Sequence, residues 1–205
     1  MPAEQTTRSW KDLVFKNRGL LLVPIALVLI VFGRPSLESA IIGIVVAAAG
    51  EMLRIWAVGY SGVTTRANVV TAPQLVTAGP YSRMRNPLYV GNAIIALGFW
   101  TAFSGRVPLW VAAAMLLCVI VLIGGVYGVI VPLEERYLEQ QFGGEYRRYR
   151  GQVPRIVPAS KPLMQQQQRG RWRSDVIVRA ESITLSYFLL MVVLVCLKLG
   201  RLSGS

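Results

Sequence analysis

The sequence predicts an all-α, polytopic membrane protein with about five transmembrane helices. Of its 205 residues, 54% are hydrophobic and only 16% are charged, and the mean hydropathy is +0.49. Ordinary soluble domains are less apolar and more charged than this. The apolar residues also gather in runs long enough to approach the thickness of a bilayer. We therefore expect residues 1–205 to form a single membrane domain whose core is shared between helices and lipid.

The expected helices follow from the apolar runs and from the Gly, Pro and Ser residues between them. The expected spans are residues 20–32, 37–60, 87–103, 107–131 and 183–199. The first is short for a full crossing and needs flanking residues or a thinned bilayer. Pro87 can open the third helix, because its missing N–H costs nothing at a helix start. The breaker-rich segments 33–36 and 104–106 predict tight turns, and therefore two helical hairpins.

Lys and Arg residues indicate the orientation. The N-terminus and the two long loops, residues 61–86 and 132–182, carry 17 of the 22 basic residues. The opposite side carries four, and Arg54 lies within a span. The positive-inside rule therefore predicts a cytoplasmic N-terminus in a multi-pass, integral protein of a bacterial-type inner membrane.

Composition also limits the partners. A net charge of +12 would suggest nucleic acid in a soluble protein. Here the basic residues flank apolar runs, so anionic lipid head groups are the expected partner and nucleic acid is not. Histidine is absent, and both cysteines, Cys118 and Cys196, lie in apolar runs. We therefore expect no histidine-based catalysis, no metal site and no disulfide framework.

Two polar clusters lie at membrane boundaries. Residues 79–92 read GPYSRMRNPLYVGN before the third span, and residues 134–138 read EERYL after the fourth. Charged groups are costly at such a boundary unless they have partners or a function. Because a helical hairpin joins the two clusters, we expect them to meet on the cytoplasmic side and form a polar pocket there.

The first cluster has side chains suited to an anion and to a flat cation. Asn86 is expected to cap the third helix, and its free N–H groups with Arg85 suit a carboxylate or phosphate. Tyr81 and Tyr89 offer ring faces to a purine or a sulfonium ion. The equally weighted alternative is a membrane-entry turn in which Arg85 meets lipid head groups and the tyrosines lie at the interface.

The second cluster begins a helix expected to continue out of the fourth span over residues 134–149. Adjacent helical residues point about 100° apart, so Glu134 and Glu135 should serve different partners. One suits a ribose or an ammonium, and the other suits Arg85 or Arg155. The alternative is a solvated helix end.

The remaining polar features are less specific. Glu51 and Arg54 can pair at i, i+3 within the second span, either structurally or as part of the pocket lining. Residues 153–158 are too rich in proline for a helix. Residues 159–182 form a basic juxtamembrane linker that includes a low-complexity stretch over 165–168 and an interfacial anchor around Trp172.

Taken in order, the two clusters resemble a known family. The pattern GPY-x3-RNPLY-x-GN followed by EE-x2-L-x3-FG-x2-Y-x2-Y-x3-VPR is similar to that of integral-membrane methyltransferases of the isoprenylcysteine carboxyl methyltransferase and phospholipid N-methyltransferase group. The resemblance covers about residues 52–158. It implies a methyltransferase core made of a cofactor-binding loop, a helical hairpin and the following cytoplasmic segment.

The resemblance also implies the ligands. S-adenosylmethionine would be the methyl donor and S-adenosylhomocysteine the product, with a lipid or prenylated small molecule as acceptor. We assign cofactor binding to Leu75, Thr77, Gly79, Tyr81, Arg85, Asn86, Tyr89, Glu134 and Glu135. Arg155 and Tyr146 are the catalytic candidates, which would close the site or hold the acceptor.

One position departs from the family pattern. The familiar eukaryotic members have Arg-His-Pro where this chain has Arg85-Asn86-Pro87. Asparagine cannot titrate, so a mechanism that needs an imidazole here is not expected. Transfer from an activated sulfonium depends on positioning and desolvation, which tolerates the loss.

Two other functions stay open. The Glu51–Arg54 pair and the glycine-rich helices would suit a small transporter or a lipid-binding scaffold, although the polar residues gather at one face rather than along a path. A nicotinamide-dependent reductase on a related scaffold would need more spans.

Overall fold

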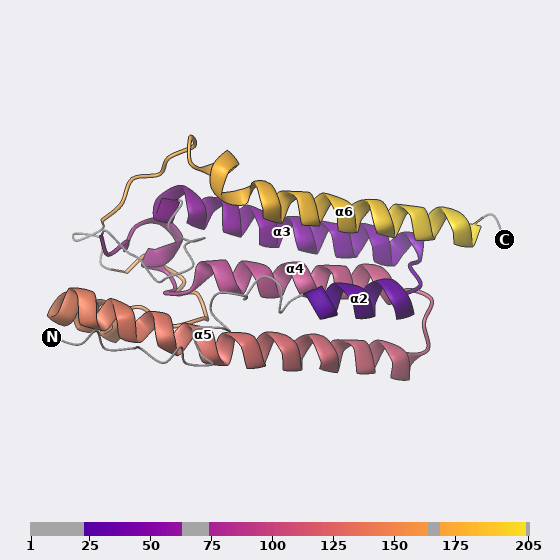
Figure 1. The fold of residues 1–205 in the computed structure, drawn as a ribbon, viewed down its shortest axis with the longest axis horizontal. Helices are drawn as coiled ribbons and strands as arrows, with labels where there is room; N and C mark the ends of the chain where they lie inside the picture. Colours follow the sequence, from indigo (N-terminus) through magenta and orange to yellow (C-terminus); the bar gives the residue numbers. More distant parts are fainter. Residues whose placement is uncertain (1–22, 63–73, 164–168, 204–205) are drawn as a thin grey trace, which may run out of the picture.

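The protein is a bundle of long helices, with its loops and an extended segment gathered at one end (Figure 1). The computed structural model describes residues 23–62, 74–163 and 169–203. Its elements are α2 (Val23–Phe32), α3 (Leu37–Ser61), the 3-10 helix η3 (Gly79–Ser82), α4 (Pro87–Phe103), α5 (Leu109–Gln152) and α6 (Ile177–Ser203). These ranges contain no strand, which confirms the all-α class.

Three of the helices, α3, α5 and α6, are long and apolar enough to cross a membrane. The apolar helices α2 and α4 are shorter, with 10 and 17 residues. At 1.5 Å per residue α4 is about 25 Å long, close to the roughly 30 Å of a hydrocarbon core. The polytopic membrane class is therefore confirmed. The expected third span agrees with α4 residue for residue, and residues 20–22 of the expected first span lie outside the described residues.

Both expected tight turns are present, and they are bonded to each other, but only α4 and α5 pack as the expected hairpin, since α2 packs against α4 and α5 rather than against α3. The Arg34 N–H donates to the Phe103 carbonyl at 2.8 Å, and the Arg106 N–H donates to the Arg34 carbonyl at 2.8 Å. Ser36 caps α3 by accepting from the Ser39 N–H at 3.1 Å. These turns lie at the same end of the bundle as the C-terminal end of α6 (Figure 1). The bonds hold α2, α3, α4 and α5 in register there.

Glycines allow α3 and α4 to approach closely. A Cβ at Gly43 would overlap the backbone at Gly98, and one at Gly50 would crowd the carbonyl of Gly91. Small residues at such crossings let membrane helices pack backbone to backbone. The close crossing continues toward the other end, where a Cβ at Gly91 would meet the side chain of Arg54.

Helix α5 extends well beyond the bilayer. It contains Pro132, and a non-helical break at Gly143, where φ is +51°, divides it into two helices. The first of these, residues 109–142, would measure about 51 Å, well over the roughly 30 Å of the hydrocarbon core. Residues 134–149 are thus helical as expected except for this break, and the chain leaves the second helix at Val153 in an extended conformation (φ −101°, ψ 125°). This end forms a second core, in which Tyr146, Tyr149 and Val153 cluster with Leu75.

Helix α6 begins earlier than expected. It starts at Ile177 rather than at Ile183, so the end of the expected linker is helical. The reason is Glu181, which is 1% exposed and bonded within the bundle instead of lying in a polar loop. The low-complexity stretch 165–168 lies outside the described residues.

Candidate functional site

Glu135 joins the two polar clusters at the end of the bundle opposite the bonded turns. Its Oε1 accepts from Arg85 Nε at 3.1 Å and from Arg85 Nη2 at 2.9 Å. Arg155 donates from Nε to the same oxygen at 3.1 Å and from Nη2 to Oε2. We call Arg85, Glu135 and Arg155 the boundary cluster. It shows that side chains fifty or more positions apart in the chain share one location.

The boundary cluster is held in its charged form. Glu135 lies on the part of α5 beyond the expected span, where burial alone would raise the pKa of its carboxyl group. Hydrogen bonds from Arg155 and Arg85 outweigh that effect and hold the pKa of Glu135 below its ordinary value. The bond with Glu135 in turn raises the pKa of Arg155. One carboxylate therefore sits between two guanidinium groups, with a net positive charge.

Arg85 also docks the segment that follows α5. Its Nη1 donates to the carbonyls of Arg150 and Val153, each at 2.8 Å, and its backbone N–H donates to the Pro154 carbonyl at 2.9 Å. The guanidinium group of Arg85, which was expected to bind a carboxylate or phosphate, is thus bonded to Glu135 and to backbone carbonyls of the chain. Arg85 positions the extended segment against the start of α4.

Asn86 differs from its expected capping role. It occupies the N-cap position of α4, but its side chain makes no capping hydrogen bond. Instead Asn86 Nδ2 donates to the Arg155 carbonyl at 3.1 Å. Pro87 follows it and offers no N–H, while the docked segment brings a carbonyl within reach. The expectation of a capping Asn86 was wrong, and the residue ties Arg155 to the helix start.

Glu134 has a separate environment from Glu135, as the helical angle between them predicts. It accepts a hydrogen bond from the Tyr89 hydroxyl at 2.6 Å. The Tyr89 ring lies 4.5 Å from the ring of Tyr127 at an angle of 46°. A carboxylate beside two aromatic rings attracts a cation.

The loop residues before η3 support the site from behind. Leu75 is buried in the second core. The Thr77 N–H donates to the Arg169 carbonyl at 3.0 Å, and the Arg169 N–H donates back to Thr77 Oγ1 at 2.9 Å. Gly79 has a φ of +61°, and a Cβ there would overlap the ring of Tyr60. These contacts use the Thr77 backbone that was expected to face a cofactor, and they fasten the chain ahead of α6.

Two tyrosines of the site, Tyr146 and Tyr149, are buried, and Tyr81 is half-buried. The Tyr149 hydroxyl donates to the Tyr81 carbonyl at 2.8 Å. Burial raises the pKa of Tyr81, of Tyr149 and of Tyr146 above the ordinary value. Tyr146 is 1% exposed, and within the described residues its hydroxyl has no hydrogen-bond partner. An orphaned buried hydroxyl costs about 1–3 kcal/mol, so a ligand that bonds to it would recover free energy.

A second arginine cluster lies inside the bundle and was only half expected. Arg54 lies 3.7 Å from Glu51, the expected pair, but its stronger partner is Glu181 on α6. Arg54 Nη2 donates to both carboxylate oxygens of Glu181 at 2.8 Å, and Nη1 donates to Asn92 Oδ1 at 2.6 Å. We call Arg54, Asn92 and Glu181 the membrane cluster.

The membrane cluster reaches toward the boundary through Tyr127. Asn92 Nδ2 donates to the Tyr127 hydroxyl at 2.7 Å, and the Tyr127 ring packs on Tyr89. Asn92 belongs to the GN of the first motif, so the sequence offered a signal for it. Tyr127 lies in an apolar run, and nothing in the sequence around it indicates this contact.

Comparison with known proteins indicates a family for this chain. The sequence model of a family described as phospholipid methyltransferase matches residues 39–145, just over half of the chain. That range includes Arg54, Asn92 and both glutamates of the second cluster, and it ends before Arg155 and α6. No curated protein and no solved structure matches the chain.

Proposed function

Because the chain belongs to the phospholipid methyltransferase family, we propose that it uses S-adenosylmethionine to methylate a lipid-like or prenylated acceptor at the membrane boundary. The family implies methyl transfer and a lipid substrate in general terms. The observation that carries the finer proposal is the boundary cluster, which joins both halves of the motif beside the Tyr89–Glu134 pair. Residues 52–158 would form the methyltransferase core.

The residues present fit such a cofactor. The Glu134 carboxylate and the rings of Tyr89 and Tyr127 form a cation-attracting environment for a sulfonium. Arg155, whose side chain is 49% exposed, is the cation best able to turn from Glu135 toward a ligand carboxylate. The orphaned Tyr146 hydroxyl supplies a further donor. When bound, S-adenosylmethionine supplies a methyl group already activated for transfer.

The protein then has to position the methyl donor and the acceptor and to exclude water from the site. Arg85 and Asn86 hold the 153–155 segment against the start of α4, which closes the site from the solvent side. The second core around Tyr149 keeps the loop before η3 in place. A carboxylate or a free amine can accept a methyl group without a strong base. The site therefore serves either O- or N-methylation.

Calorimetric titration of the purified protein in detergent with S-adenosylhomocysteine tests the cofactor. We expect binding by the wild type and a loss of about a hundredfold or more in Glu134→Gln, which removes the charge facing the sulfonium side of the ligand. Glu139→Gln is the matched control, because Glu139 lies on the same helix and pairs with the exposed Arg147 and Arg150. Well-folded protein that does not bind, or equal losses in both variants, would contradict the proposal.

Labelling identifies the acceptor class. Host membranes incubated with the protein and a radioactive methyl donor should yield labelled, lipid-soluble products. Mild base releases the label from a methyl ester and leaves a methylated amine intact, so one treatment separates O- from N-methylation. Label found only in water-soluble products would argue against a lipid-like acceptor.

We also propose that the N-terminus and the site face the cytoplasm, as the basic residues indicate. Single cysteines replacing Arg148 and Arg106, with Cys118 and Cys196 changed to serine, would test this. An impermeant thiol reagent on intact cells should label Arg106→Cys at once. It should label Arg148→Cys only after the cells are permeabilised, and the reverse pattern would invert the topology.

A further inference from the structure

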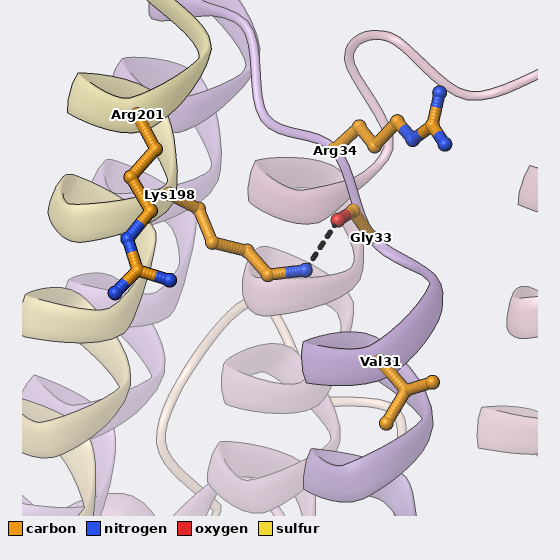
Figure 2. A pocket seen from close by; sticks show the side chains of 5 residues that line it. All are labelled: Val31, Gly33, Arg34, Lys198 and Arg201. Carbon is orange, nitrogen blue, oxygen red and sulfur yellow. Dashed lines mark hydrogen bonds between the residues drawn. The ribbon is translucent and has the colours of Figure 1, made fainter.

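A basic hollow lies at the end of the bundle opposite the boundary cluster. It is lined by Val31, Gly33, Arg34, Lys198 and Arg201 and has a volume of about 220 Å³. Figure 2 shows it between α6 and the turn that follows α2. The hollow is therefore built by two segments far apart in the chain, and it is separate from the proposed methyl-transfer site.

The frame of this hollow is fixed by hydrogen bonds. Lys198 Nζ donates to the Gly33 carbonyl at 2.7 Å, which links α6 to the turn (Figure 2). The backbone N–H and carbonyl of Arg34 both bond to the neighbouring turn, to Phe103 and Arg106, at 2.8 Å. A Cβ at Gly33 would overlap the Phe103 side chain. The cationic residues thus start from defined backbone positions rather than from a loose loop.

The hollow concentrates positive charge without a compensating acid. Among the described residues, no carboxylate forms an ion pair with Arg34, Lys198 or Arg201. Glu38, the acid nearest to Arg34 in sequence, is exposed in the first turn of α3 and joins none of them. Figure 2 shows the Arg34 and Arg201 side chains on opposite sides of Lys198 and extended away from each other, as expected for exposed like charges with no anion between them.

The distribution of charge on this side of the membrane argues against a general basic cap. The end of the bundle away from the long loops has four Lys and Arg residues, and three of them line this hollow. One apolar side chain, Val31, lines the hollow beside these charges and is 67% exposed. A phosphate with attached acyl chains would satisfy both features.

We propose that this hollow binds the phosphate of an anionic phospholipid, with an acyl chain along Val31. The exposed side chains of Arg34 and Arg201 turn toward the phosphate and donate to its oxygens, and Lys198 contributes its charge while it holds the turn. The proposal does not depend on the methyl-transfer activity.

Native mass spectrometry and thermal melts of the protein in maltoside micelles test it with phosphatidylglycerol as the probe. Each Lys or Arg near an anionic head group contributes about 1 kcal/mol, so Arg34→Gln/Arg201→Gln should weaken phosphatidylglycerol binding roughly thirtyfold. The matched control is Arg148→Gln/Arg171→Gln, which removes the same charge from exposed positions at the other end. The control should bind as the wild type does.

Three further measurements distinguish phospholipid binding from general effects of charge or of phosphate. Arg201→Gln alone, at an exposed position, should keep the helical circular dichroism of the wild type and lose about fivefold in affinity. Phosphatidylcholine and inorganic phosphate at matched concentrations should raise the melting temperature less than phosphatidylglycerol does. An equal effect of inorganic phosphate, or equal weakening in the control variant, would overturn the proposal.

Discussion

The boundary cluster and the membrane cluster use the same chemistry, arginine with glutamate, yet they differ in access to solvent. In the boundary cluster Glu135 is 7% exposed at its side chain, while its partner Arg155 is 49% exposed. In the membrane cluster Arg54 and Glu181 are 11% and 1% exposed. The residues of a buried ion pair have no other group to bond to if they separate. An exposed arginine can instead turn away from its glutamate and bind a ligand. Exposure, rather than the number of charges, separates the cluster suited to binding from the one suited to locking helices.

The two clusters also differ in which of their residues lie within residues 39–145, the range that the family model matches. The boundary cluster connects Arg85 and Glu135, both inside residues 39–145, with Arg155 just beyond. The membrane cluster connects Arg54, inside the match, with Glu181 on α6, well outside it. Helix α6 therefore supplies the closer, doubly bonded partner of an arginine in the matched range, within which Arg54 pairs with the more distant Glu51.

The largest expected effect comes from breaking the membrane cluster. Glu181→Ala leaves Arg54 buried with only the more distant Glu51, and removing one partner of a buried pair costs about 3–5 kcal/mol. We expect the free energy of unfolding in detergent to fall by that amount. Asp175→Ala, which breaks an exposed pair with Arg173, is the control and should leave the free energy of unfolding nearly unchanged. Similar values for the two variants would show that α6 is not locked by its charge.

Breaking the centre of the boundary cluster should lower the free energy of unfolding by less than breaking the membrane cluster does. Glu135→Gln keeps the shape but removes the charge between Arg85 and Arg155, and hydrogen bonds to charged groups contribute about 1.5–3 kcal/mol. We expect a loss of about 2–3 kcal/mol in unfolding free energy, because Arg155 can turn to solvent while Arg85 cannot. Binding of S-adenosylhomocysteine should fall with it, since the 153–155 segment loses its anchor. Unchanged stability would mean that the carbonyl contacts of Arg85 suffice.

The sequence predicted one cluster and missed half of the other for physical reasons. Arg85 and Arg155 lie outside the helices beside Pro87 and Pro154, and Glu135 follows the end of an apolar run. At such positions polar residues interrupt the apolar pattern and can be recognised. Glu181 lies less than one helical turn before Ile183, where the hydropathy of the sequence predicts that the last span begins. The residues around Glu181 do not indicate that the helix includes it, because the partner that makes its burial possible, Arg54, is 127 positions away in the chain. Long-range pairing inside the bundle needs the fold, whereas helix types and most boundaries follow from apolar periodicity and breakers.

Acid should sharpen the comparison by weakening the boundary cluster. The pKa of Glu135 in the folded protein lies below the ordinary value of 4.5. Its stabilising contribution is therefore complete above that value and is lost as the pH falls through the lower, folded-state pKa. Melting temperatures of the wild type and of Glu135→Gln, measured from neutral pH downward, should differ at pH 7 and converge in acid. Curves that remain parallel would exclude Glu135 as the titrating group.

The smallest effect on stability, and the most informative for function, is expected at Arg155. Arg155→Gln removes a half-exposed partner of Glu135, and such pairs contribute about 0–1 kcal/mol. Arg85 continues to neutralise Glu135, so the melting temperature should change little. If Arg155 is the residue that turns to the ligand, affinity for S-adenosylhomocysteine should still fall about tenfold, the loss expected for one charge-assisted hydrogen bond. Arg150→Gln, whose side chain bonds the partly exposed Glu139 on the same side, should alter neither quantity. A parallel fall in stability and affinity at Arg155 would instead make it a structural tie, and the boundary cluster would then resemble the membrane cluster in function as well as in chemistry.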